Sequence, residues 1–120
     1  MDHVCLTLHV LPGKTEKARA MMHQLNGARQ KEFDESERRL GITKELWYLA
    51  TFPFGDHLIG YIEATDFNRA MQNFVASGDA FDQWFKHEML EVSGLDLNDP
   101  PEDLTPPERL LHYEATTVVR

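Results

Sequence analysis

Alternating apolar and polar positions open the chain and predict a β-strand over residues 3–11. One face of this segment is apolar (Val4, Leu6, Leu8, Val10) and the other is mixed (Cys5, Thr7, His9, Leu11). Pro12 and Gly13 follow at once and are expected to end the strand, because both residues favour turns.

A helical period replaces the alternation from Thr15 to Leu40. Apolar residues recur there at spacings of three and four, which is typical of an amphipathic helix (Ala18, Met21, Met22, Leu25, Ala28, Phe33, Leu40). Gly27 lies within the pattern and weakens a helix, so we expect a kink or two separate pieces. Gly41 is expected to end the helical region as a left-handed cap.

Two further strands are predicted over residues 45–53 and 57–65, which are rich in aromatic and β-branched residues. They flank Phe54-Gly55-Asp56, so the sequence predicts a hairpin with a short glycine-containing loop. Asp66 follows as the expected N-cap of the next helix, since its carboxylate can accept hydrogen bonds from the first turn.

A second helical region is predicted in two segments separated by Ser77-Gly78-Asp79 and ending near Gly94. Their apolar stripes are Phe67, Ala70, Met71, Phe74 and Val75, and then Phe81, Trp84, Phe85, Met89 and Val92. Residues 96–108 contain four prolines and five acidic residues and are expected to form an extended surface connection. Residues 109–120 are predicted to form a last strand.

The resulting order is strand–helix–strand–strand–helix–strand, which predicts an α+β, ferredoxin-like split βαβ fold over a single domain, residues 1–120. Its four-stranded antiparallel sheet would carry both helices on one face. Several strands are apolar on both faces: Trp47 and Leu49 alternate with Tyr48 and Phe52. Strands of this kind are buried on both sides, so we expect a homodimer in which two sheets pack face to face.

Charge and composition narrow the classes of partner. The 120 residues carry a formal charge of −8, which disfavours nucleic acid and anionic membrane surfaces. The lone Cys5 cannot form an intrachain disulfide or a cysteine-based metal site. No apolar run is long enough to span a membrane and the N-terminus lacks a leader pattern, so we expect a cytoplasmic protein.

The chain resembles the dimeric α/β-barrel superfamily, which includes antibiotic-biosynthesis monooxygenases, small polyketide cyclases and haem-degrading monooxygenases. The resemblance rests on Leu11-Pro12-Gly13-Lys14, the hairpin through Gly55, the break at 77–79 and the closing segment 106–114. It is similar above all to a small bacterial family of unassigned activity. The resemblance implies a cofactor-independent monooxygenase or polyketide cyclase-type enzyme that acts on an aromatic or polyketide-like compound. The alternative that it implies is a non-catalytic ligand-binding or stress-response dimer.

The resemblance also offers haem binding as a further alternative. The positions that the haem-degrading branch uses correspond to Cys5, to Phe74, and to Trp84 or Phe85, with His87 two or three residues away. Because these residues do not match the family's ligands, no cofactor is expected. The aromatic residues Phe81, Trp84 and Phe85 are also suited to an ordinary core.

The polar residues of the central strands are the candidates for chemistry. If the register brings His9 close to Tyr61 or Glu63, the carboxylate can orient the imidazole as a general base. The alternative is that these side chains only line a solvated face. We therefore predict catalytic roles for His9, Tyr61 and Glu63 in a pocket between helices and sheet. The residues predicted to contact a small apolar or aromatic ligand are Thr7, Trp47, Phe74 and Trp84.

One further pair of titratable residues, His87 and Glu91, does not require a metal site. His87 and Glu91 lie four residues apart on one helix, which is compatible with a metal ligand pair or with a solvated ion pair. Two ligands do not make a metal site, so no metal is expected. What the sequence leaves open is the substrate, the strand register and the face on which His9 lies.

Overall fold

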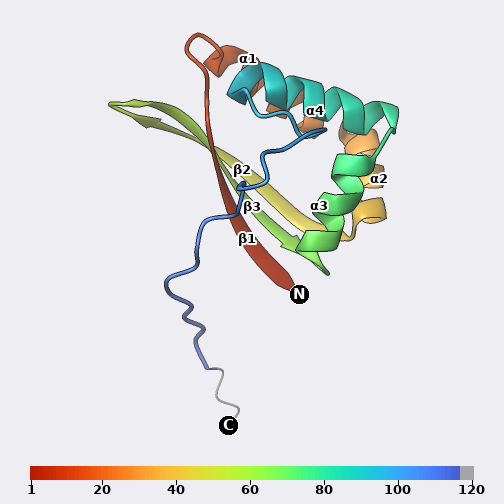
Figure 1. Ribbon diagram of the computed structural model, residues 1–120, viewed down its shortest axis with the longest axis vertical. Helices are drawn as coiled ribbons and strands as arrows, with labels where there is room; N and C mark the ends of the chain where they lie inside the picture. The colour runs from red at the N-terminus through yellow and green to blue at the C-terminus, as the bar shows by residue number, and fades with distance from the viewer. Residues whose placement is uncertain (117–120) are drawn as a thin grey trace.

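The computed structural model describes residues 1–116 of the chain. Seven helices and strands follow one another in the order β1 (Asp2–His9), α1 (Thr15–Asn26), α2 (Gln30–Leu40), β2 (Ile42–Phe52), β3 (Gly55–Ala64), α3 (Phe67–Ala76) and α4 (Ala80–Ser93). Figure 1 shows the helices gathered on one side of the curved sheet. The α+β architecture predicted from the hydrophobic pattern is therefore present.

The sheet is antiparallel, with β3 in the centre between β1 and β2. Its register aligns His9 with His57, Cys5 with Tyr61, and Trp47 with Gly60. Leu58 and Ile62 of β3 face the helices and are almost completely buried. Between them Ile59 and Tyr61 point to the opposite face, as the two-residue period of a strand requires.

Helix α1 ends at Asn26 and α2 starts at Gln30, so the helical region divides at Gly27 as the sequence predicts. Gly41 ends α2 with a φ of 78°, in the left-handed region that favours glycine. This cap turns the chain directly into β2 at Ile42.

The hairpin differs from the prediction in its loop. Strand β2 continues to Phe52 and β3 begins at Gly55, so the turn consists of residues 53–54 rather than 54–56. Gly55 has a φ of 130°, which only glycine adopts without strain, and this lets it pair with Phe52 as the first residue of β3.

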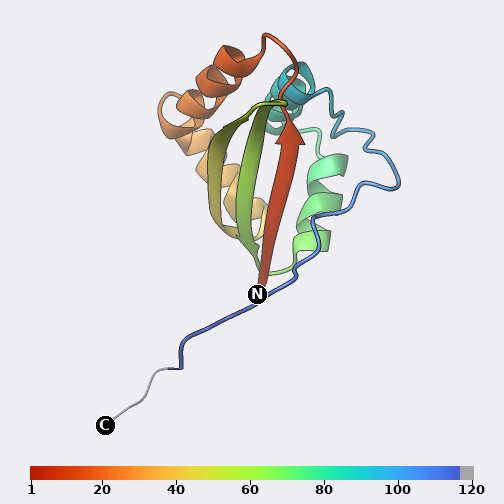
Figure 2. The same ribbon diagram turned by 90° about the vertical axis from the view of Figure 1, so that its left-hand side faces the viewer.

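Helices α3 and α4 begin at side-chain caps. The carboxylate of Asp66 accepts a hydrogen bond from the backbone N–H of Arg69 at 3.1 Å, as expected. Asp79 caps α4 in the same manner by accepting from the N–H groups of Phe81 and Asp82. Figure 2 shows the two helices at different heights on one side of the sheet, with a short connection between them.

The prediction of a four-stranded sheet is wrong for the described residues, because the sheet has three strands. Residues 109–116 are extended and exposed, and residues 117–120 of the predicted last strand lie outside the described part. The proline-rich segment that precedes them reaches the beginning of β1, where Arg109 donates to the backbone oxygen of His3 at 2.9 Å. A strand antiparallel to β1 would have to start at the other end of β1. Residues 110–116 therefore continue past the sheet (Figures 1 and 2).

Large apolar side chains remain exposed on the face of the sheet away from the helices. On β2, Leu46, Tyr48 and Phe52 are 43%, 59% and 40% exposed. This is the doubly apolar character that predicted a covered sheet face. No helix in the described residues is long and apolar enough to cross a membrane.

Candidate functional site

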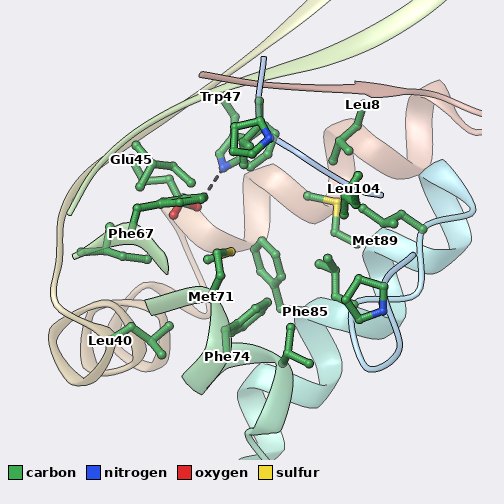
Figure 3. A pocket seen from close by; sticks show the side chains of 18 of the residues that line it. Leu8, Leu40, Glu45, Trp47, Phe67, Met71, Phe74, Phe85, Met89 and Leu104 are labelled. Atoms are coloured by element: carbon green, nitrogen blue, oxygen red, sulfur yellow. Dashed lines mark hydrogen bonds between the residues drawn. The ribbon is translucent and has the colours of Figure 1, made fainter. Parts of the chain in front are cut away.

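A cavity of about 610 Å³ lies between the inner face of the sheet, α2, α3, α4 and the segment 95–108 (Figure 3). Its size is in the range of small-molecule sites. Its wall is mainly apolar and aromatic, and includes Leu8, Phe67, Met71, Phe74, Phe85, Met89 and Leu104. A ligand here would exchange water for hydrocarbon and aromatic surface over most of its area.

Two carboxyl groups interrupt this apolar wall. Glu37 of α2 and Glu45 of β2 line the cavity, and their carboxyl groups are hydrogen-bonded to each other. The indole Nε1–H of Trp47 donates to Oε2 of Glu45 at 2.8 Å, as drawn in Figure 3. The cavity therefore holds a pair of acidic groups with one fixed hydrogen-bond donor.

Local periodicity places both groups on the cavity side. Glu37 is four residues after Phe33 and three before Leu40, so it shares the inner face of α2 with them. Glu45 is two residues before Trp47 on β2, so both side chains point to the helices. Gly41 brings these two elements together by reversing the chain between them.

The apolar surroundings keep a proton on this pair at neutral pH. Burial, reinforced by the charge of Glu45 and the hydrogen bond to it, raises the pKa of Glu37 to about 10. Burial also raises the pKa of Glu45, and the hydrogen bonds from Trp47 and Glu37 oppose this rise. The hydrogen bond between them raises the pKa of Glu37 and lowers that of Glu45, which favours Glu37 as the protonated partner. Such a pair contains an acid and a base side by side.

The outer wall of the cavity is formed by the segment 95–108, which we call the strap. Pro100, Pro101 and Leu104 contribute to the wall. The strap is anchored at Asn98, whose side-chain oxygen accepts a hydrogen bond from Nζ of the buried Lys86 at 3.0 Å. This hydrogen bond fixes the strap next to the cavity, and the proline-rich part of the strap forms the outer wall.

A buried ionic cluster supports the helices behind the cavity. Asp82 of α4 is completely buried and accepts hydrogen bonds from Ser36, Arg39 and Ser77. Burial acts to raise the pKa of Asp82, but these hydrogen bonds outweigh it and hold the pKa below its usual value. The cluster joins α2 to α4 and so fixes the helix that carries Glu37.

The four residues predicted to contact a ligand do not all lie in the cavity wall. Trp47 and Phe74 line the cavity. Thr7 touches its boundary beside Leu6 and Leu8 but occupies an exposed, outward position of β1. Trp84 is not part of the cavity wall, and packs beneath the guanidinium of Arg29, 4.3 Å from the ring centre.

The residues predicted to be catalytic lie on the opposite face of the sheet from this cavity. Tyr61 donates to Glu63 at 2.7 Å, so these two are together. His9 is not with them, because the register places it opposite His57, with the ring centres 5.1 Å apart. A role for His9 as a general base required it to lie close to Tyr61 or Glu63, and it does not. Catalytic roles for these three residues stay predictions.

The described residues do not fit haem. No histidine lines the cavity in the part of the chain that is described. Cys5 is exposed on the outer sheet face, and the exposed His87 lies 3.7 Å from the carboxylate of Glu91 on the surface of α4. No group of three potential metal ligands occurs among residues 1–116.

Glu37 and Glu45 are the site residues that sequence reasoning missed. A signal was present, since Glu37 occupies an apolar position of its helix and Glu45 shares the parity of Trp47 and Leu49. Charged residues at inward positions of both elements are unusual unless they are paired. Neither position, however, indicates the other as its partner.

The comparisons with known proteins concern the fold. No protein-family model matches the chain, and no curated protein matches its sequence. An L-rhamnose mutarotase from Formosa agariphila is similar in structure, with a TM-score of 0.64, 10% identity, and coverage of 95% of this chain and all of the other. Tetracenomycin F2 cyclase from Streptomyces glaucescens, a type-II polyketide cyclase, has a TM-score of 0.57 and 15% identity, over 97% of this chain and all of the other. At these identities the likenesses show the fold alone, which is ferredoxin-like.

Proposed function

We propose that the cavity binds a small, uncharged, largely apolar molecule that carries a carbonyl or hydroxyl group. The observation that supports this most strongly is the carboxyl pair in an otherwise apolar wall. An anionic ligand would lose its hydration and find no cationic side chain among the described residues of the wall, which is unfavourable. An uncharged ring compound can instead bury its apolar surface and direct its oxygen at the pair.

We further propose that the pair catalyses proton transfer without a cofactor, as in a cyclase or an isomerase. For a ketone, Glu45 takes a proton from the carbon beside the carbonyl while Glu37 gives its proton to the carbonyl oxygen, and an enol results. The enol carbon is the nucleophile that a cyclisation needs. The mutarotase and cyclase names of the structural neighbours are compatible with this class of reaction. A monooxygenase has no equivalent support among the cavity residues.

The exposed sheet face supports a homodimer. Tyr48 is 59% exposed there and has apolar neighbours at Leu46 and Ile59 on its own and the adjacent strand. A second copy packed on this face would cover them, as the sequence pattern predicts. The face also carries His9, Tyr61 and Glu63, so a role for these residues at the interface remains part of the proposal. The cytoplasmic location expected from the sequence stays a prediction.

The first experiment tests binding with two naphthalene probes that differ in charge. 2-Naphthol is uncharged at pH 7, whereas 2-naphthoate carries a negative charge. We expect 2-naphthol to quench the fluorescence of Trp47 and 2-naphthoate to leave it unchanged. Equal binding of both probes, or binding of neither, would contradict the proposed ligand class. Trp84→Phe removes the other tryptophan, which lies outside the cavity wall, and so isolates the signal.

The second experiment tests proton transfer. 2-Tetralone is a two-ring ketone whose protons beside the carbonyl exchange with D₂O, and NMR follows the exchange. The protein is expected to accelerate it, and Glu45→Gln is expected to abolish the acceleration. Glu35→Gln changes an exposed carboxyl on the helix that bears Glu37 and serves as the control. Binding without accelerated exchange would favour the alternative of a non-catalytic ligand-binding protein.

A further inference from the structure

The indole ring of Trp47 occupies space that is free because the residue opposite it has no side chain. The register pairs Trp47 with Gly60, and a Cβ on Gly60 would approach three ring carbons of the indole to 2.7–2.9 Å. Such distances are too short for a real contact, so only glycine allows the ring to lie across β3 in this position. The same ring position aims the indole N–H at Glu45.

We propose that Trp47 is a positioning residue that decides which carboxyl of the pair is the base. Its N–H donates to Oε2 of Glu45 and has no equivalent contact with Glu37. This inference rests on the proposed function, since it assigns the roles of acid and base within the same site.

The physical reason is the donor-only character of the indole. Its N–H can donate but cannot accept, and a hydrogen bond to an ionised carboxylate is stronger than one to a neutral carboxyl group. The bond therefore favours the state in which Glu45 is ionised and Glu37 carries the proton. Without it, two carboxyl groups in contact would share one proton with much less preference.

In the described residues no other charged group donates a hydrogen bond to either carboxyl group of the pair. Asp82 of α4 acts in the same direction as the indole, because its negative charge raises the pKa of Glu37, and Arg39 is bound to Asp82. Glu108 of the strap lines the cavity but is exposed. The wall residues from β1 and α3 are uncharged. Trp47 is thus the donor that distinguishes one carboxyl from the other.

The test measures the titration of Glu45 directly, by ¹³C NMR of glutamate carboxyl carbons in the Glu37→Gln background. Glu37→Gln leaves a single titrating carboxyl in the pair, so that coupling no longer obscures the assignment. Adding Trp47→Phe removes the donor and keeps an aromatic ring. We expect the pKa of Glu45 to rise by about one unit, a tenfold change in proton affinity, because a hydrogen bond to a charged group is lost. An unchanged midpoint would overturn the proposal.

Two further variants keep the test specific. Tyr48→Phe removes a hydroxyl from the neighbouring outward position of β2 and is expected to leave the Glu45 titration unchanged. Gly60→Ala displaces the indole without removing it and is expected to raise the pKa of Glu45 in the same direction as Trp47→Phe. A shift in Tyr48→Phe equal to that in Trp47→Phe would show a general effect of β2 and contradict the assignment.

One measurement needs no substitution of Trp47 or Gly60. The indole N–H resonance of Trp47 is expected to titrate with the midpoint of the Glu45 carboxyl carbon, and an indole resonance that is insensitive to this titration would also overturn the proposal. None of these readouts uses a ligand or turnover. A titration shift in a protein that neither binds 2-naphthol nor exchanges 2-tetralone would refute the proposed function and leave the role of Trp47 intact.

Discussion

Replacing Glu37 with glutamine is expected to make the protein more stable at neutral pH and to leave it nearly unchanged in acid. The amide of Glu37→Gln can still donate to Glu45, so it imitates the protonated carboxyl group. In the wild-type protein, folding requires Glu37 to keep its proton, since its pKa is raised from 4.5 to about 10. The unfolded chain has no such requirement.

Proton linkage gives the sign and the size of this change in the free energy of unfolding. Above the unfolded pKa of 4.5, the folded state binds one more proton than the unfolded state, so stability falls as the pH rises toward the folded pKa. The loss is about 1.4 kcal/mol per pH unit while this difference persists. Between pH 5 and 7 it amounts to at most about 3 kcal/mol, reduced by any water that enters the cavity.

Urea unfolding, followed by circular dichroism at several pH values, measures this effect. The free energy of unfolding of Glu37→Gln minus that of the wild-type protein is expected to grow from pH 5 to 7 and to be close to zero near pH 4. Titrating groups that do not interact with Glu37 cancel in the difference. The exposed control Glu35→Gln should show no such trend. A difference that stays constant with pH would refute the shared-proton reasoning, because it would show that Glu37 has an ordinary pKa.

Three other predictions concern the supports of the site. Asp82→Ala removes the acceptor of three hydrogen bonds, one of them from the buried Ser36, and is expected to lower the free energy of unfolding by about 2 kcal/mol, measured in urea. Lys86→Met removes the hydrogen bond to Asn98, so the strap should be cleaved faster by a protease while circular dichroism still shows folded protein; unchanged cleavage would mean that the strap is held by its prolines alone. Tyr48→Lys places a charge on the exposed sheet face and is expected to convert a dimer into a monomer in analytical ultracentrifugation. A monomeric wild-type protein would instead refute the homodimer.

The hydrophobic pattern was sufficient for the helices, for three of the strands and for the break at Gly27. Local periodicity decides these features, because an amphipathic segment has to bury one face whatever its partner is. The cap at Asp66 and the turn at Gly41 are equally local, since each depends on the chemistry of one residue and its own backbone.

Only the tertiary structure decided the course of residues 95–116 and the composition of the site. A segment such as 109–116 becomes a strand only if the preceding strap brings it to the correct end of β1, and that depends on three-dimensional distances. Likewise, the register that separates His9 from Glu63 is a property of two paired strands. Glu37 and Glu45 become an acid–base pair because α2 and β2 enclose them in one apolar cavity, where the loss of water raises the pKa of both carboxyl groups. The sequence determined which faces are buried, whereas packing determined which polar groups share that burial.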